Sequence, residues 1–185
     1  GDHILDTFLT VTKALSVATA GDTIHIYPGE YTEIFPLTIP AGVTVKGHGI
    51  RSVTIQPTLA TNTNDAFLLN GETTVEDLTI TGFYSPGYAF KYAPNYTARN
   101  RSPYIRNITV ITQGSTITAD DPRGFLAGDA GKGVFLDGSV ASSTSANTAL
   151  LFHSVTFITP GVDAVILTNG ARVEWLNSFT YFANR

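Results

Sequence analysis

The sequence predicts an all-β fold, a solenoid in which short parallel strands stack coil upon coil behind one N-terminal capping helix. Three observations indicate this. The chain of 185 residues is 43% hydrophobic but only 14% charged, which suits a buried core of strands joined by tight turns. Four segments share one residue pattern, and a second family of apolar segments alternates with them along the chain. Such self-similarity is typical of solenoids.

Composition also excludes several classes of protein. A net charge of -4 provides no electrostatic footprint for nucleic acid or an anionic membrane surface, so we expect neither as a partner. The chain has no cysteine, hence no disulfide and no thiolate metal site, and we predict no metal and no cofactor. No apolar run approaches the roughly 18 residues of a membrane-spanning helix. Because the sequence contains no methionine, we expect it to be part of a longer protein.

The first element is a helix predicted over residues 8–19, within an N-terminal segment of residues 1–20. Apolar residues recur there at helical spacing: Phe8, Val11, Leu15 and Ala18. Asp6 or Thr7 is placed to cap its start, and Gly21 to end it. In a solenoid such a helix would cover the first coil, whose open edge would otherwise pair with other chains.

Coils are expected from residue 21 to residue 185. The stretch "TIHIY" (23–27) is a short strand, and Pro28-Gly29 turns a corner after it. A strand this short is stable in a solenoid because it gains hydrogen bonds from the coils above and below, each about 4.8 Å away.

The first family of repeats comprises "VEDLTIT" (75–81), "IRNITVIT" (105–112), "FHSVTFIT" (152–159) and "LNSFTYF" (176–182). Aligned, they predict three inward-facing columns: Val75, Ile105, Phe152 and Leu176; Leu78, Ile108, Val155 and Phe179; Ile80, Val110, Phe157 and Tyr181. The polar column between them is predicted to form a ladder at a bend, bonding neighbouring backbone groups: Asp77, Asn107, Ser154 and Ser178.

The second family comprises "DAFLLNG" (65–71), "YAFKYAP" (88–94), "KGVFLDG" (132–138) and "DAVILTNG" (163–170). Alternation along a strand predicts inward columns of Phe67, Phe90, Val134 and Val165, and of Leu69, Tyr92, Leu136 and Leu167. The outward column would be Leu68, Lys91, Phe135 and Ile166. Three of these four are large and apolar, so we expect this wall to be covered by a neighbouring subunit, as in a trimer, or by the chain's own insertions.

Loop insertions are predicted near residues 83–104 and 113–131. The first holds a cluster of aromatic and basic residues: Tyr84, Tyr88, Tyr92, Tyr96, Tyr104, Lys91, Arg99, Arg101 and Arg106. Tyrosine and arginine are favoured at recognition surfaces, and aromatic rings stack on sugars. Two interpretations stay open: a glycan-binding or subunit-contact patch, or tyrosines that pack the loop onto the coil wall.

The second insertion contains the candidate catalytic group Asp120, Asp121 and Arg123. Paired carboxylates would bind Ca²⁺ or act as acid and base. The alternative is a loop turn, because Asp-Asp-Pro is common in turns. The histidines show no metal-ligand spacing: His3, His25, His48 and His153.

The stretch "FLTVTKALSVATAGDTIHIYPGEYTE", followed by "LTIPAGVTVKGHG", resembles the capping helix and first coils of right-handed parallel β-helix proteins of the pectate-lyase-like superfamily. The segments "DAFLLNGETTVEDLTITG" and "RSPYIRNITVI" resemble virion structural proteins of T4-like marine cyanophages. The resemblance implies a single right-handed parallel β-helix over nearly the whole chain.

It also implies a function: a structural module of a phage virion appendage, such as a tail fibre or spike, located in the virion. Its partners would be two further copies in a homotrimer, other virion proteins, or a host cell-surface polysaccharide. The alternative within the superfamily is a polysaccharide lyase or hydrolase, for which Asp120, Asp121 and Arg123 are the candidates. A bacterial surface adhesin of the same fold is a third class.

Overall fold

The computed structural model describes residues 7–140 and 149–184, and nearly all of their regular structure is β-strand. One sheet contains β1 (Thr23–Ile26), β2 (Gly29–Glu33), β4 (Thr44–Gly47), β5 (Val53–Pro57), β7 (Thr74–Thr81), β9 (Tyr104–Ile111), β11 (Ala149–Ile158), β13 (Arg172–Leu176) and β14 (Phe179–Tyr181). The other contains β3 (Leu37–Thr38), β6 (Phe67–Leu69), β8 (Tyr88–Tyr92), β10 (Lys132–Asp137) and β12 (Val165–Thr168). We call them the long and the short sheet.

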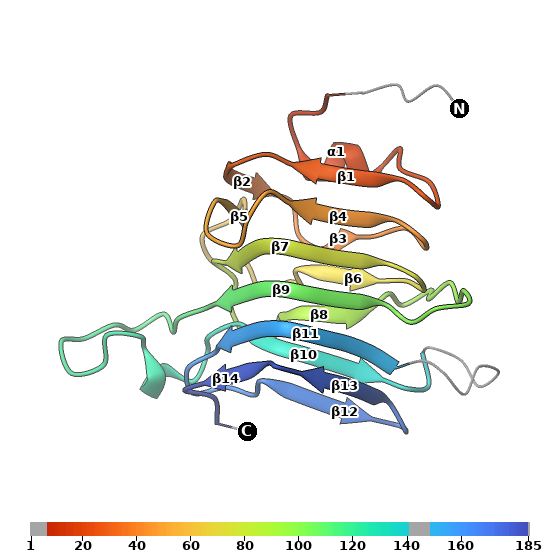
Figure 1. Ribbon diagram of the computed structural model, residues 1–185. Helices are drawn as coiled ribbons and strands as arrows, with labels where there is room; N and C mark the ends of the chain where they lie inside the picture. Colours follow the sequence, from red (N-terminus) through yellow and green to blue (C-terminus); the bar gives the residue numbers. More distant parts are fainter. Residues whose placement is uncertain (1–6, 141–148, 185) are drawn as a thin grey trace.

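Neighbouring strands in both sheets pair in parallel. The long sheet runs β1-β4-β7-β9-β11-β13, and the short sheet runs β3-β6-β8-β10-β12. From β6 to β13 the chain alternates between the short and the long sheet. Each strand therefore pairs with the previous strand of its own sheet, and one strand of the other sheet lies between them in the sequence. We call one passage of the chain through both sheets a coil. Figure 1 shows the two stacks running together from the N-terminal to the C-terminal end. The predicted mostly β, parallel arrangement is confirmed.

The core lies between the two sheets, and most of the predicted inward columns form it. Hydrogen-bonded registers place like residues over one another, for example Val75 beside Ile105 beside Phe152. Members of the first family that are completely buried are Val75, Leu78, Ile80, Ile105, Ile108, Val110, Phe152, Val155 and Phe157. From the second family they are Phe67, Leu69, Phe90, Val134 and Leu136. Burial of this apolar surface at about 25 cal/mol per Å² is the main force holding the coils together.

The predicted alignment of the last repeat is wrong by one residue. Trp175, not Leu176, lies beside Phe152, and Leu176 lies beside His153. Phe179 and Tyr181 pair with Thr156 and Ile158, so both stay about half exposed, at 52% and 50%. Leu167 does lie in register with Leu136, but it is exposed because it belongs to the last coil of the described chain.

The backbone bend explains this shift. Asp77, Asn107 and Ser154 adopt positive φ angles of 61°, 52° and 57°, as the predicted polar bend requires. In the last coil Asn177 adopts this conformation, with φ 46°, in place of Ser178. Asparagine is favoured in the left-handed region. The ladder is bonded through side chains, with Asn107 Nδ2 donating to Asp77 Oδ1 and Asn177 Nδ2 donating to Ser154 Oγ over 3.1 Å.

The helix is shorter than predicted. It spans α1 (Val11–Leu15), with Thr10 as N-cap and Ser16 as C-cap, so neither Thr7 nor Gly21 bounds it. Asp6 lies outside the described residues. Gly21 instead belongs to the coils, because its N–H donates to Gly42 O over 2.9 Å.

A buried carboxylate from β2 holds this helix on the first coil. Glu33 accepts hydrogen bonds from Val11 N (2.6 Å), Thr12 N (2.9 Å) and Thr12 Oγ1 (2.6 Å). These N–H groups open the helix and have no partner within it. Val11, Ala14 and Leu15 face the core beneath.

We expect Glu33→Gln to lower the free energy of unfolding by about 1–3 kcal/mol, because it removes charge-assisted bonds and turns an amide donor toward backbone donors. Urea unfolding followed by circular dichroism measures this. The control is Glu30→Gln, an exposed residue of the same strand. Equal losses in the two variants would contradict the capping role.

Candidate functional site

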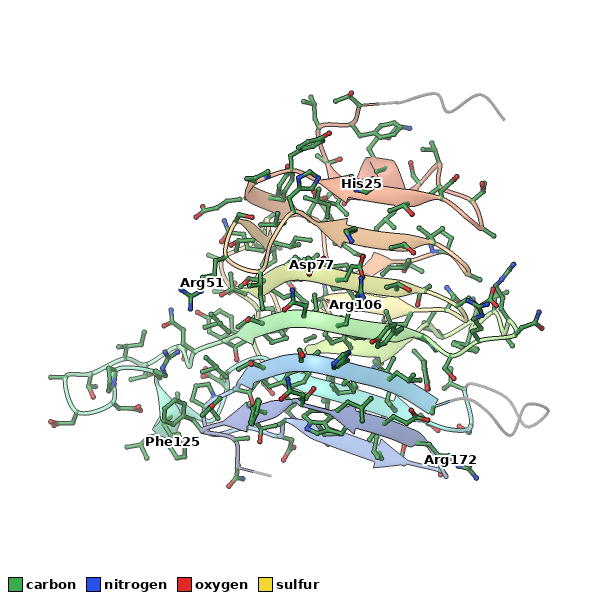
Figure 2. The ribbon with its side chains drawn as sticks, viewed as in Figure 1. His25, Arg51, Asp77, Arg106, Phe125 and Arg172 are labelled. Atoms are coloured by element: carbon green, nitrogen blue, oxygen red, sulfur yellow. The ribbon has the colours of Figure 1, made fainter. Side chains whose placement is uncertain are left out.

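A column of ionisable side chains crosses the outer face of the long sheet. In register order it comprises His25, Lys46, Glu76, Arg106 and His153, from β1, β4, β7, β9 and β11. Figure 2 labels His25, Asp77 and Arg106 on this face. The residues before them on β4, β7 and β9, Val45, Val75 and Ile105, are buried, so alternation turns the column outward.

Glu76 is the centre of this column. Its Oε1 lies 2.8 Å from Lys46 Nζ, and its Oε2 accepts a hydrogen bond from Arg106 Nε. Lys46 Nζ also lies 3.7 Å from a carboxylate oxygen of Asp77. Glu76 is only 5% exposed, and its carboxylate ties together three successive coils. We call Lys46, Glu76 and Arg106 the ionic clamp.

The protonation states follow from this geometry. Burial alone would raise the pKa of Glu76, but the hydrogen bonds and charges of Arg106 and Lys46 outweigh it, so the pKa lies below the ordinary 4.5. The hydrogen bond and charge of Glu76 raise the pKa of Lys46 and of Arg106. All three groups are therefore ionised at neutral pH, and none is poised to act as a general acid or base there.

Aromatic and imidazole rings flank the clamp. His25 and His48 meet edge to face with ring centroids 6.1 Å apart, and the centroid of the Tyr27 ring lies 4.5 Å from that of His48. At the other end, Tyr104 Oη and His153 Nδ1 are 3.0 Å apart and share a hydrogen bond. Within the described ranges, no three histidine or carboxylate side chains gather closely enough to hold a metal ion.

The tyrosine and arginine cluster of residues 83–106 does not form one surface. Tyr88 lies on β8 of the short sheet, whereas Tyr104 lies on β9 of the long sheet. Tyr84 is next to the second insertion, forming a bridge with Ala130. Tyr104 therefore lies on a different sheet from Tyr88, whereas Tyr84 and Tyr88 stay close together, beside Ala130 and Lys132.

The loop of residues 93–103 is fastened to the coils. The Tyr96 ring packs edge to face on buried Tyr92, with centroids 5.1 Å apart. Arg99 Nε donates to Glu72 Oε2 over 2.7 Å, and the backbone oxygen of Arg101 accepts from Glu72 N over 2.9 Å. The side chains of Tyr96 and Arg99 therefore hold the loop on the coil wall, which is the second of the two interpretations of this cluster. The Arg101 side chain is exposed.

The outward column of the short sheet forms as a column: Leu68, Lys91, Phe135 and Ile166 pair in register. The chain covers part of this apolar wall with its own lysines. Lys91 Nζ lies 5.5 Å from the Phe135 ring centroid, and Lys132 Nζ lies 5.4 Å from that of Tyr88. Their aliphatic stems shield the rings. The ammonium of Lys91 lies 3.3 Å from Asp65 Oδ2, and that of Lys132 lies 3.8 Å from Asp163 Oδ2.

The candidate catalytic residues are held in a projecting arm, residues 113–131, which carries the short 3₁₀ helix η1 (Phe125–Ala127; Figure 1). Asp121 Oδ1 accepts from Phe125 N at 2.7 Å, and its Oδ2 accepts from Leu126 N at 2.8 Å. Asp120 is exposed. The Arg123 guanidinium carbon, Cζ, lies over the Phe182 ring, 5.8 Å from its centroid. Asp121 thus caps η1, and this local structural role agrees with the alternative in which Asp-Asp-Pro forms a loop turn.

Residues 6–147 match the protein family described as "Protein of unknown function (DUF1565)". The chain belongs to this family. DUF1565 is associated with β-helix-like proteins, in agreement with the parallel sheets described above. No curated protein and no solved structure gave a match to the chain.

The DUF1565 match includes the helix, its Glu33 cap, the ionic clamp and the arm, whereas β11 to β14 follow it. No helix in the described part of this DUF1565 chain is both long enough and apolar enough to cross a membrane.

Sequence reasoning missed three residues that the structure makes important: Glu33, Glu76 and Trp175. A signal existed for Glu76, because the aligned positions of neighbouring coils carry Lys46 and Arg106, so charge alternates down the column. Trp175 directly precedes the fourth repeat of the first family (176–182), and its ring stacks on that of Phe157 with centroids 5.6 Å apart. Glu33 carried no local signal, because its partners lie over 20 residues away.

Proposed function

We propose that this DUF1565 member is a right-handed parallel β-helix that serves as a stiff structural module of a phage virion appendage, such as a tail fibre or spike. The alternation of the chain between two parallel sheets supports the helical path. Right-handed crossovers are the strong rule for parallel strands joined in this way.

The observation that best supports a structural role is that side chains on the outer surface bond neighbouring coils to one another. The ionic clamp joins three coils, and the bend ladder joins pairs of coils. Lys91 and Lys132 lie along the wall of the short sheet. Side chains that bond coil to coil outside, over stacked apolar columns inside, resist bending and local opening. This is the property that a virion appendage needs.

The likeness of "DAFLLNGETTVEDLTITG" and "RSPYIRNITVI" to cyanophage virion proteins supports placing the module in a virion. The competing lyase or hydrolase function is less well supported, since both carboxylate oxygens of Asp121 are bonded to backbone N–H groups of η1. For contact with a host polysaccharide, the exposed Arg101 is better placed than Arg99, which is paired with Glu72.

The test uses particles of the phage that encodes the chain. Mass spectrometry of purified virions should detect its peptides at a level comparable to other appendage proteins, and antibody labelling in electron micrographs should mark an appendage. Absence of the chain from intact particles would contradict the proposal.

A second assay addresses catalysis. The purified chain is incubated with host lipopolysaccharide and a panel of polyuronates, and new reducing or unsaturated ends are measured. We expect none. Ends that appear with the wild type but not with an Asp120→Asn, Asp121→Asn variant would establish the enzyme instead.

A further inference from the structure

The ionic clamp leaves part of its arginine unused. A guanidinium carries five N–H donors, and its two Nη atoms form an edge that holds an oxyanion end-on. Arg106 donates to Glu76 through Nε, while the other Glu76 oxygen, Oε1, lies 2.8 Å from Lys46 Nζ. Within the described ranges this Nε–H is the only side-chain donor of Arg106 that bonds a protein group, and the side chain is 45% exposed. The Nη edge is therefore open to a ligand.

The surroundings of Arg106 differ between its two sides. On one side lie the carboxylates of Glu76 and Asp77, on β7. On the other side Arg106 pairs in register with His153 of β11, a strand that carries no carboxylate. In the described chain the first carboxylate beyond β11 in the long sheet is Glu174 of β13, one coil further away. An anion can therefore approach Arg106 from the β11 side without first meeting a carboxylate.

His153 adds a second donor, and Tyr104 orients it. Tyr104 Oη and His153 Nδ1 are 3.0 Å apart. An imidazole nitrogen is a stronger acceptor than a phenol oxygen, so the phenol O–H donates to Nδ1 and the proton of the neutral ring lies on Nε2. His153 is exposed, so this Nε2–H is available at the surface. Because β9 and β11 are neighbouring strands about 4.8 Å apart, Arg106 and His153 can contact one small anion together.

The opposite end of the clamp offers no equivalent site. His25 and Lys46 also pair in register. Lys46 Nζ, however, lies 2.8 Å from Glu76 and 3.7 Å from Asp77, so two carboxylates neutralise this ammonium. His25 packs against the ring of His48 rather than beside an open guanidinium. These two histidines therefore serve as an internal control for His153.

The donors suit a phosphate group. Those of Arg106 and His153 come from two coils and approach a shared ligand from different directions, whereas a carboxylate presents its two oxygens in one plane. Phosphate is tetrahedral and doubly charged near neutral pH, so separate oxygens can bond the guanidinium and the imidazole. We propose that Arg106 and His153 form a binding site for a phosphate group, free or carried by a sugar, on the outer face of the long sheet (Figure 2). Tyr104 is its positioning residue.

Nuclear magnetic resonance of the ¹⁵N-labelled chain tests this site. Inorganic phosphate is titrated into the protein at neutral pH while the imidazole signals are followed. The His153 signals should shift along a saturable curve, whereas those of His25 and His48 should stay in place. Before phosphate is added, the ¹⁵N shifts should place the His153 proton on Nε2. In Tyr104→Phe they should show a mixture of the two tautomers, because the bond to Nδ1 is lost.

Three variants separate the site from general effects of charge. Arg106→Gln and His153→Phe should each raise the dissociation constant for phosphate about tenfold, measured by ³¹P line broadening, because each removes a donor to a charged group. Arg101→Gln, at an exposed arginine of the 93–103 loop, should leave it unchanged. His153→Phe lies outside the ionic clamp, so it keeps the test valid if circular dichroism shows that Arg106→Gln unfolds.

Titration with a hexose phosphate distinguishes the two sources of the ligand, since tighter binding than that of inorganic phosphate indicates a sugar-borne group. The proposal is overturned by an absent His153 shift, by equal shifts of His25, His48 and His153, or by acetate binding as tightly as phosphate. An unchanged dissociation constant in both Arg106→Gln and His153→Phe would overturn it as well. The virion role requires no such ligand, so this failure would leave it intact.

Discussion

Replacing Phe152 with alanine is expected to lower the free energy of unfolding by about 3–5 kcal/mol, the range for large aromatic truncations in a core. Phe152 is completely buried where the two sheets meet. Its ring centroid lies 6.1 Å from that of Phe90 on the short sheet, and 5.8 and 5.2 Å from those of Phe157 and Trp175. Alanine would leave a cavity bounded by these three aromatic rings, which come from β8, β11 and β13. Urea unfolding measures the loss.

The matched control is Phe125→Ala, on exposed η1 of the arm. It should cost less than about 1 kcal/mol, because surface substitutions remove few contacts. If Phe152→Ala cost no more than this control, the stacked aromatic column would not be what holds the coils together.

Breaking the ionic clamp is the second large effect. We expect Glu76→Gln to lower the free energy of unfolding by about 2–3 kcal/mol at pH 7, because it leaves two cations beside each other without their shared carboxylate. This lies below the full cost of breaking a buried pair, since the side chains of Lys46 and Arg106 are 36% and 45% exposed. A double-mutant cycle with Arg106→Gln should give a coupling energy above about 1 kcal/mol. Additive effects would show that the clamp does not join the coils.

The clamp also predicts a pH dependence. The folded-state pKa of Glu76 is lowered from 4.5, so Glu76 stabilises the fold fully above that value and loses this contribution as the pH falls through its folded pKa. The pKa values of Asp129 and Asp137 are also lowered, by bonds from Ser115 and Ser139 respectively, so acid will weaken the wild type for several reasons. The difference between wild type and Glu76→Gln isolates the clamp. It should shrink below pH 4.5, and a constant difference down to pH 2 would contradict the account.

Much of the fold was predictable because the repeat carries two independent signals. Alternation along a strand assigns Leu78 and Ile80 to the inside, and repetition places Ile108 and Val110 over them. The last repeat shows where this reasoning stops. Leu176 fits the apolar pattern as well as Trp175 does, and only the left-handed bend at Asn177 decides between the two registers.

The candidate site was less predictable, because closeness in sequence does not place residues on one face. Tyr88 and Tyr104 are 16 residues apart, yet the chain crosses from the short sheet to the long sheet between them. Conversely, Lys46, Glu76 and Arg106 come from three coils and meet at one carboxylate. Contacts of this kind depend on the register of the coils, which must be known before they can be recognised.

The most direct test of the stacked parallel coils is a set of distances between spin labels, which the absence of native cysteine makes simple to introduce. Thr23, Thr44, Thr74, Tyr104, Leu151 and Glu174 form one column through successive registers. Electron spin resonance on Thr44→Cys, Glu174→Cys should give a backbone separation of about 19 Å, and on Thr23→Cys, Glu174→Cys about 24 Å, because the pairs span four and five steps of about 4.8 Å. The pair His25→Cys, Leu176→Cys, at the other end of the same strands, should again give about 24 Å. Unequal distances for the two five-step pairs, or no increase from four steps to five, would contradict the parallel stack.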